Sequence, residues 1–206
     1  MKEYIAKKVS YKLKMEDDVW EKLPAAELTE GWWDLFEKNY KTVARLAHTD
    51  DGVILRMESE EWPITIKTMT QNTEVCFDSC MEFFFTPNTL VTDYVNVEAS
   101  AGSTPLCYVG PDREHRKGLN AIAEGLEFKT MLEFEKGWKL YVYIPFSFMK
   151  KHFSEVGKEF KANFYKCGEE TVISHFCTWN KVDTPEPDYH RPEFFGKVIL
   201  SDEMAI

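Results

Sequence analysis

The sequence predicts an all-β protein, an antiparallel β-sandwich of the jelly-roll type with about ten strands and one or two short helices. Apolar and polar residues alternate with a period of two along most apolar segments, which is typical of strands with one buried face. Gly, Pro, Asn and Asp separate these segments at short intervals, and few segments show helical periodicity. A hydrophobic content of 44% with 15% aromatic residues is sufficient for a large core and excludes intrinsic disorder.

Ten segments are predicted as strands. The first two, 42–48 and 53–58, are joined by the hairpin-type turn Thr49-Asp50-Asp51-Gly52. In segment 76–85, alternation places Met81, Phe83 and Phe85 on the core side and Glu82 on the opposite face. The remaining predicted strands are 64–68, 93–98, 126–134, 138–144, 160–165, 172–179 and 194–200.

Helical signals are limited to two segments. Residues 147–153 fit a short helix that is entered from Pro145 or capped by Ser147. Residues 28–40 form a second, ambiguous candidate. The chain contains no internal repeat, low-complexity segment or Gly/Pro-rich linker, so we expect residues 1–206 to form a single domain.

The net charge of −10 and the pI near 5.1 limit the classes of partner that can be expected. Binding to nucleic acids or to anionic membranes requires clustered Lys and Arg, so neither partner is expected. No apolar run reaches the ~18–20 residues that span a bilayer, and the first residues contain no signal peptide. We expect a cytoplasmic protein, or an exported one if a leader has been removed; the sequence carries no signal of oligomeric state.

Five cysteines are present, and none of them forms a CxxC pair. We expect reduced, mostly buried thiols in a cytosolic setting. Structural zinc sites use paired ligand spacings that this sequence lacks, so the spacing does not favour such a site.

The C-terminal third combines aromatic residues with hydrogen-bonding side chains. Two aromatic-rich segments, 160–168 and 174–179, precede the loop Pro187-Asp-Tyr-His-Arg-Pro192. The two prolines restrict the backbone of this loop, which lowers the entropy lost on binding a ligand. An aromatic ring beside polar groups is the combination that holds a sugar, so Tyr189 is the first candidate for ligand contact, with Arg191 beside it.

The sequence also resembles a known family. Asp78-Ser-Cys-Met-Glu-Phe-Phe84 resembles the D-S-x-x-E-F-F strand of carbohydrate-binding module family 9-like domains. Further matching segments follow in the family's order and extend the resemblance from about Trp20 to Leu200: Tyr94-Val-Asn-Val-Glu98 with Gly102, Trp138 with Tyr143-Ile-Pro-Phe146, Asn163-Phe-Tyr-Lys-Cys167, His175, Trp179, and His190-Arg-Pro-Glu-Phe-Phe-Gly196.

The resemblance implies a β-sandwich that binds carbohydrate, often in support of polysaccharide breakdown. In sugar-binding members two aromatic rings clamp the sugar, and by motif position these fall at Tyr189 and Cys76. Because Cys76 is not aromatic, Trp62 is considered as a replacement. Together the loop and the resemblance give the predicted ligand-binding residues: Glu82, Asn96, Asn163, Trp179, Tyr189 and Arg191.

Each candidate also has a structural interpretation. Glu82 fits equally well as a solvated or Arg-paired carboxylate, Tyr189 as a plug at the sandwich edge, and Trp179 as a core residue or a cavity wall. Asn96, Glu98 and Asn163 fit a polar network that closes the sandwich. The sequence specifies no metal ligand set, although the resemblance raises structural calcium as a cofactor, for which Asp50 and Asp51 are weak candidates.

The leading hypothesis is therefore a non-catalytic carbohydrate-binding domain with a saccharide as partner. The alternative is a glycoside hydrolase, or an accessory subunit of one, built on Asp78, Glu82 and Glu98. Asp78 and Glu82 lie about 13 Å apart on one strand at ~3.3 Å per residue, whereas glycosidase carboxylates are ~5–9.5 Å apart. A third hypothesis, haem binding through His175 or His190, lacks a specified pair of ligands. No GxSxG, HExxH, GxGxxG or P-loop motif is present.

Overall fold

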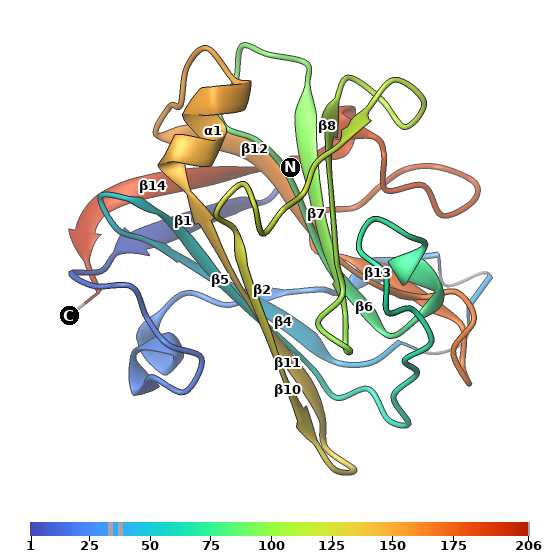
Figure 1. Cartoon of the computed structure of the whole chain (residues 1–206). Coiled ribbons are helices and arrows are strands. Elements are labelled where there is room, and N and C mark those ends of the chain that lie inside the picture. The colour runs from blue at the N-terminus through green and yellow to red at the C-terminus, as the bar shows by residue number, and fades with distance from the viewer. Residues whose placement is uncertain (33–34, 37–38, 206) are drawn as a thin grey trace.

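The strands join into one large sheet that curls back on itself, so that its two halves face each other (Figure 1). The structure is a computed structural model that describes residues 1–32, 35–36 and 39–205. The strands of the described residues are β1 Glu3–Lys8, β2 Ala26–Glu27, β3 Glu30–Gly31, β4 Thr42–His48, β5 Gly52–Ser59, β6 Cys80–Thr86, β7 Tyr94–Ser100, β8 Pro105–Gly110, β9 Lys117–Gly118, β10 Glu127–Glu133, β11 Gly137–Pro145, β12 Glu159–Gly168, β13 His175–Thr178 and β14 Gly196–Met204.

Helical structure in the described residues is short. The α-helix α1 covers Phe146–His152 and packs beside β5 and β11. Three single 3-10 turns, η1 (Asp18–Lys22), η2 (Val75–Phe77) and η3 (Pro192–Phe194), complete the helical elements. None of the described helices is long and apolar enough to cross a membrane.

The main path of the sheet runs β10-β11-β5-β4-β1-β14-β12-β6-β7-β8-β9. Neighbouring strands are antiparallel except for β1, which pairs in parallel with both β14 and β4. The N-terminal strand thus joins the two halves of the curled sheet. The predicted all-β sandwich class is confirmed, although the described residues form fourteen strands rather than about ten.

Most predicted strands are found near their predicted bounds, and the helix predicted at 147–153 is α1. The strand predicted at 64–68 is wrong. Its backbone N–H groups bind side chains instead of a neighbouring strand: Thr65 donates to Ser79 Oγ, and Lys67 and Thr68 donate to the Asp78 carboxylate. The candidate helix at 28–40 lies partly outside the described residues, and its described part contains the two-residue strand β3.

The two faces of β6 and β12 separate the interior into two apolar clusters. Met81, Phe83 and Phe85 point between the two halves of the sheet, as the alternation predicts. Phe84 and Tyr165 lie on the opposite face, in a second cluster. That second face carries the candidate site described below.

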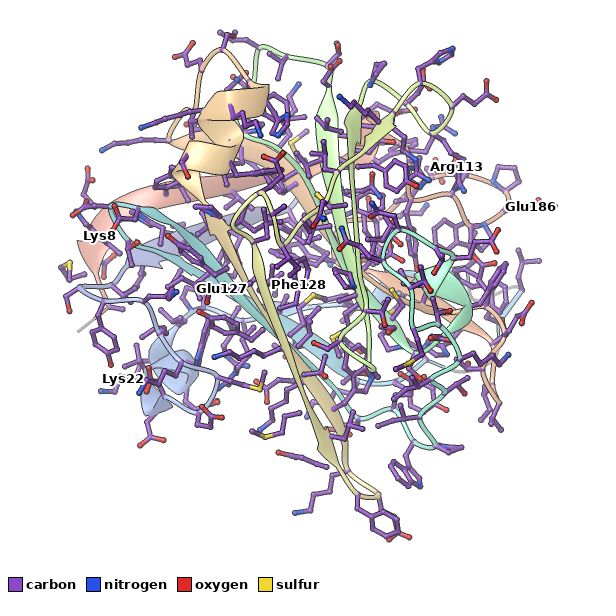
Figure 2. All side chains as sticks on the ribbon, viewed as in Figure 1. Lys8, Lys22, Arg113, Glu127, Phe128 and Glu186 are labelled. Carbon is purple, nitrogen blue, oxygen red and sulfur yellow. The ribbon has the colours of Figure 1, made fainter. Side chains whose placement is uncertain are left out.

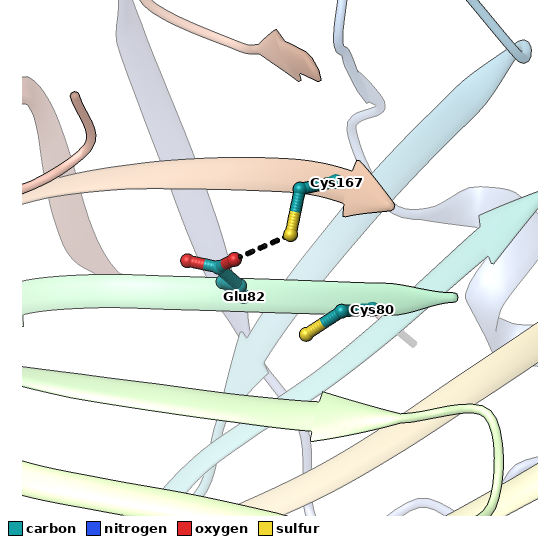
Figure 3. Close-up of side chains that lie close together, drawn as sticks. All are labelled: Cys80, Glu82 and Cys167. Atoms are coloured by element: carbon teal, nitrogen blue, oxygen red, sulfur yellow. Dashed lines mark hydrogen bonds between the residues drawn. The ribbon is translucent and has the colours of Figure 1, made fainter. Parts of the chain in front are cut away.

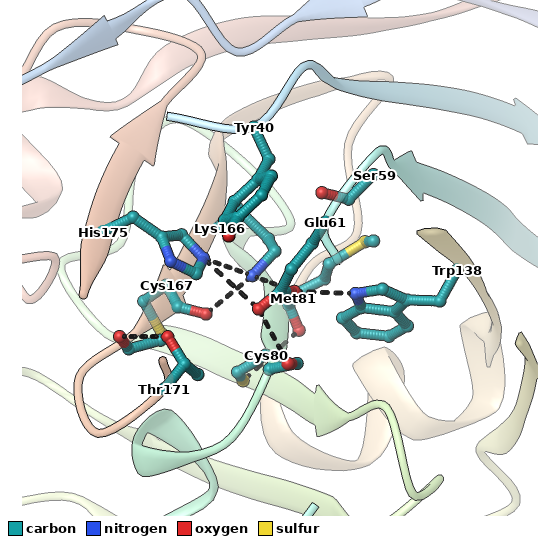
Figure 4. A network of polar contacts seen from close by, with 12 residues as sticks. Tyr40, Ser59, Glu61, Cys80, Met81, Trp138, Lys166, Cys167, Thr171 and His175 are labelled. Atoms are coloured by element: carbon teal, nitrogen blue, oxygen red, sulfur yellow. Dashed lines mark hydrogen bonds and ion pairs between the residues drawn. The ribbon is translucent and has the colours of Figure 1, made fainter. Parts of the chain in front are cut away.

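A charged network is buried between the two halves of the sheet (Figure 4). Lys166 Nζ lies 2.8 Å from Glu61 Oε2 and 2.6 Å from His175 Nε2. Glu61 also accepts hydrogen bonds from Ser79 Oγ at 2.7 Å and from Trp138 Nε1 at 2.9 Å. Burial raises the pKa of Glu61, but the charges of Lys166 and His175 outweigh this effect and lower it overall. The network is thus closed, with opposite charges paired.

Candidate functional site

A cavity with a volume of about 390 Å³ opens on the outer face of β6, β7 and β8. This volume falls within the range of small-molecule sites, ~300–1,000 Å³. The 3-10 turn η2 and the loop 187–190 form further walls. Arg113 at the cavity rim lies on the side of the molecule away from Lys8 and Lys22 (Figure 2).

Strand register places two acidic residues together at the cavity floor. Glu82 of β6 and Glu98 of β7 are direct cross-strand partners, so their side chains lie on the same face. Both are buried, and both line the cavity. Cys167 Sγ of β12 donates a hydrogen bond to Glu82 Oε1 over 2.9 Å, and Asn96 Nδ2 donates to Glu98 Oε1 over 2.9 Å.

The environment of this acidic pair favours the protonated form. Burial, and next the charge of Glu98, raise the pKa of Glu82 well above its usual value. Burial likewise raises the pKa of Glu98 to about 7, although the hydrogen bond from Asn96 and the charges of Arg116 and Arg113 oppose the rise. The pair therefore holds a proton near neutral pH, so it can both donate and accept hydrogen bonds.

Two polar groups beside the pair lack protein partners among the described residues. Asn96 Oδ1 is a buried acceptor without a donor, and Arg116 Nη1 is a buried donor without an acceptor. The Arg116 guanidinium lies over the Tyr108 ring, 4.7 Å from its centroid, and this contact fixes its position. Buried polar groups are normally hydrogen-bonded, so Arg116 Nη1, on a residue that lines the cavity, is a candidate donor to a ligand there.

The structure brings Tyr189 to the same cavity as Glu82, but covers most of its ring. Tyr189 is 7% exposed, and its ring stacks on Tyr165 with centroids 4.1 Å apart. Its hydroxyl donates to the carbonyl of Lys166 at 2.9 Å. The remaining surface of the ring borders the cavity, so Tyr189 forms a rigid aromatic wall rather than a free platform.

His190 is a neutral neighbour of that wall. Burial and the charges of Arg113 and Arg116 lower its pKa to about 2. Its Nδ1 lies 2.7 Å from the hydroxyl of Tyr94. His190 therefore contributes hydrogen-bonding capacity to the cavity without a positive charge.

Cys76 does line the cavity, on η2. The described part of the cavity wall offers three further aromatic rings, Phe77, Tyr108 and Phe176, each half-buried. The suggestion that Trp62 replaces the missing ring is wrong, because Trp62 is not among the residues lining the cavity. It packs edge-to-face with Phe134 on the turn between β10 and β11, with centroids 5.0 Å apart.

Four predicted ligand residues are not among those that line the cavity. Asn96 is fully buried, and its side-chain amide donates to Glu98. Asn163 is fully buried, and its side chain donates to the carbonyl of Asn180 and accepts from the N–H of Phe164. Trp179 packs edge-on against Phe164 in the inner core. Arg191 forms an ion pair with Glu193 at 2.6 Å instead of reaching Glu82. For these residues the structural interpretation describes the observed contacts.

Other predicted acids have partners of their own. Asp78 is buried, and its two oxygens accept the backbone N–H groups of Lys67 and Thr68. Asp50 is exposed and pairs with Lys8 at 2.6 Å. Neither Asp50 nor Asp51 belongs to a cluster of potential metal ligands among the described residues.

Sequence reasoning missed the arginines of the cavity. Neither Arg113 nor Arg116 is among the predicted ligand-binding residues, whereas both line the cavity. The signal that could have found them is the strand β8, because a hairpin from β8 to β9 returns residues 113–117 to the sheet face.

Rigid β-sheet scaffolds often carry binding residues on their loops, and the polar, aromatic-walled cavity on the outer face of this curled sheet is a candidate site of that kind. The model of carbohydrate-binding family 9 matches residues 16–200, and the chain belongs to this family. The structure is also similar to that of a candidate carbohydrate-binding protein from Bacteroides uniformis, with 25% identity, a TM-score of 0.84, and coverage of 96% of this chain and 98% of that one.

Two further similar structures are of a family 9 carbohydrate-binding module from Caldicellulosiruptor kristjanssonii. The complex with cellotriose shares 12% identity at a TM-score of 0.67, with 96% of this chain and 93% of that chain covered. The complex with glucose shares 13% identity at a TM-score of 0.69, with coverage of 97% and 96%. At these identities the likeness concerns the fold. No curated protein matches the chain.

Proposed function

We propose that the cavity binds a mono- or oligosaccharide without cleaving it, in support of polysaccharide breakdown. The observation that carries the proposal is one cavity of about 390 Å³ that combines aromatic walls, an acid pair and the unpaired Arg116 Nη1. A sugar ring is complementary to such a cavity, because its hydroxyl groups can bind the polar atoms and its apolar C–H face can pack on the aromatic rings.

Each cavity residue has a defined part in the proposal. Arg116 Nη1 donates a hydrogen bond to a sugar oxygen. The Glu82–Glu98 pair, which shares a proton near neutral pH, accepts from one hydroxyl and donates to another. The exposed parts of Tyr108, Phe176 and Tyr189 contact the C–H faces of the sugar.

The relatives indicate which saccharides to test first. The family 9 module from C. kristjanssonii is in complex with glucose in one structure and with cellotriose in the other. Glucose and cello-oligosaccharides are therefore the first ligands to test on this chain. We expect a dissociation constant in the micromolar to millimolar range, about −8 to −4 kcal/mol, because each contact contributes modestly.

Glycoside hydrolysis is the second candidate, since Glu82 and Glu98 are adjacent acids with raised pKa values. A glycosidase places its two carboxyl groups on either side of the scissile bond. Here both acids project from neighbouring strands of one wall, so they contact a bound sugar from the same side. This geometry favours binding over hydrolysis, and an assay for reducing-sugar release by the purified protein distinguishes the two.

Isothermal titration with glucose and cellotriose tests the proposal. Arg116→Met removes a charged donor from the cavity, and we expect a ~10–100-fold loss of affinity, because hydrogen bonds from charged groups contribute ~1.5–3 kcal/mol. Arg191→Met is the matched control, since Arg191 lies outside the cavity and pairs with Glu193. Equal affinities of the two variants, or no heat from wild type with either sugar at millimolar concentration, would contradict the proposal.

A further inference from the structure

Two thiols that the saccharide contacts do not use lie at the floor of the cavity: Cys167, which lines it, and Cys80, which is buried beside it. Cys80 of β6 and Cys167 of β12 are direct cross-strand partners, and Glu82 lies two residues from Cys80 on the same face. The two sulfur atoms and a Glu82 carboxylate oxygen all lie within 4.8 Å of one another. Figure 3 shows Glu82 and Cys167 turned toward each other, with Cys80 beside Glu82 on β6.

We propose that Cys80, Glu82 and Cys167 form a binding site for one thiophilic divalent cation of the Zn²⁺ class. With Zn–S bonds of ~2.3 Å and Zn–O bonds of ~2.0–2.2 Å, a tetrahedral ion holds its ligand atoms roughly 3.5–4 Å apart. Atoms that already lie within 4.8 Å reach this spacing through small side-chain rotations. Two thiolates and one carboxylate match the ligand preference of zinc, and hard cations such as Ca²⁺ prefer oxygen ligands alone.

No cation in the described part of the chain forms an ion pair with the site. Glu82 accepts the Cys167 thiol, and among the described residues no lysine or arginine forms an ion pair with it. The charge of Arg113 acts on Glu82, but its ion pair is with Asp188, 3.0 Å away. A divalent ion would supply a positive charge at the site and release the thiol protons to the solvent buffer as the metal–sulfur bonds form.

A further polar group lies in the same row of the sheet. Ser100 of β7 is the cross-strand partner of Cys80, and its buried hydroxyl has no hydrogen-bond partner among the described residues. Glu82 and Cys167 also line the cavity, so the fourth coordination position of a three-ligand ion is available to water or to a ligand in the cavity. Three protein ligands with one open position are typical of zinc sites that bind a further molecule.

The sequence argument against zinc concerned spacing along the chain. Cys80 and Cys167 are far apart in sequence, and the β6–β12 register brings them together. This inference does not depend on saccharide binding, because it uses metal binding alone as its readout.

Titration of the reduced full-length protein with Co²⁺ and Zn²⁺ tests the site. We expect one Co²⁺ per chain, with the near-ultraviolet absorption of thiolate-to-cobalt charge transfer, and displacement of Co²⁺ by Zn²⁺. Cys80→Ala and Cys167→Ala should each lose this absorption and weaken Zn²⁺ binding at least about 100-fold, since loss of a second-shell partner alone costs ~10–100-fold. Cys107→Ala is the matched control, because Cys107 is buried in the inner core on β8.

Zinc bound at one equivalent, with two sulfur neighbours by X-ray absorption, would support the site even if a cysteine variant failed to fold. Absence of Co²⁺ and Zn²⁺ binding by the wild type would overturn the proposal. So would binding that persists in both Cys80→Ala and Cys167→Ala, or zinc with only oxygen and nitrogen neighbours. In those cases the thiols and Glu82 form a hydrogen-bonded structural cluster.

Discussion

Two neighbouring residues on β12, Lys166 and Cys167, belong to two charged regions that differ in how their charges are paired. Lys166 points between the halves of the sheet, where Glu61 and His175 surround its ammonium group. Cys167, the next residue, points to the outer face and contacts Glu82 in the cavity. The inner region pairs opposite charges in a sealed space, and the outer region places two acids side by side in a space open to ligands.

The difference shows how burial alone fails to identify a functional site. Glu61 and Glu82 are both almost fully buried carboxyl groups. The pKa of Glu61 is lowered because its cations outweigh the cost of burial, whereas that of Glu82 is raised by burial and by Glu98. A buried carboxyl group paired with cations stabilises the fold. A buried carboxyl group beside a second acid, with a raised pKa, is a candidate for ligand binding.

The largest expected effect is a difference in the free energy of unfolding between a variant of the inner network and a variant of the cavity pair. Glu61→Gln removes the negative partner of the buried Lys166, and we expect a loss of ~3–5 kcal/mol in the free energy of unfolding. Glu82→Gln removes one of two adjacent acids, so we expect no loss or a gain at neutral pH. Urea unfolding measures the free energy of unfolding of both variants, and the comparison is valid if their m-values equal that of the wild type. Similar losses in the two variants would show that the cavity pair is also structural.

The second prediction concerns pH. An unfolded Glu titrates near ~4.3, and Glu98 in the fold titrates at about 7, so the folded state holds more protons between these values. The stability of the wild type should therefore fall as pH rises from about 4.3 to 7, with a slope of up to ~1.4 kcal/mol per pH unit from this group. Glu61, with a lowered pKa, contributes stability that is lost only at more acidic pH.

Urea unfolding at several pH values, with EDTA present, measures this slope. Glu98→Gln should reduce it and leave the part due to Glu82, whose pKa burial also raises. If the variant keeps the wild-type slope, the raised pKa does not belong to Glu98.

The smallest expected effect tests the wall of the cavity. Cys76 lies on η2 at the cavity edge, so Cys76→Trp adds an aromatic surface against which a sugar can stack. We expect about fivefold tighter binding of glucose, corresponding to ~1 kcal/mol for an added aromatic contact. Trp62→Ala, which changes an aromatic residue outside the cavity, should leave the affinity unchanged. Titration calorimetry measures both, and weaker binding by Cys76→Trp would indicate that the ring blocks the cavity.

The fold was largely predictable because alternation along β6, β7, β10 and β11 is a local property of the sequence. The strand β1 was missed, since its sequence Glu-Tyr-Ile-Ala-Lys-Lys carries charged residues among few apolar ones, and its two parallel partners come from distant segments. The false strand at 64–68 has an alternating pattern, but side chains from 78–79 bind its backbone.

The site was predictable only in part. Alternation placed Glu82 on the outer face, and the loop composition and family resemblance singled out Tyr189; the structure brings both to one cavity. The exclusion of Asn163 and Trp179 depends on partners that become neighbours only in the fold, whereas Arg191 pairs with Glu193, two residues further along the chain. The Glu82–Glu98 pair and the thiol cluster depend on strand register, which a single sequence does not specify.

The most direct test of the account is a ¹H–¹⁵N chemical-shift titration of the protein with glucose. Saturable shifts should concentrate at the backbone amides around Glu98, Arg116 and Cys167, while the indole N–H of Trp138, bonded to Glu61 in the inner network, should stay in place. Shifts confined to the turn between β10 and β11, or an unchanged spectrum at millimolar glucose and cellotriose, would contradict the assignment of this cavity as a saccharide site.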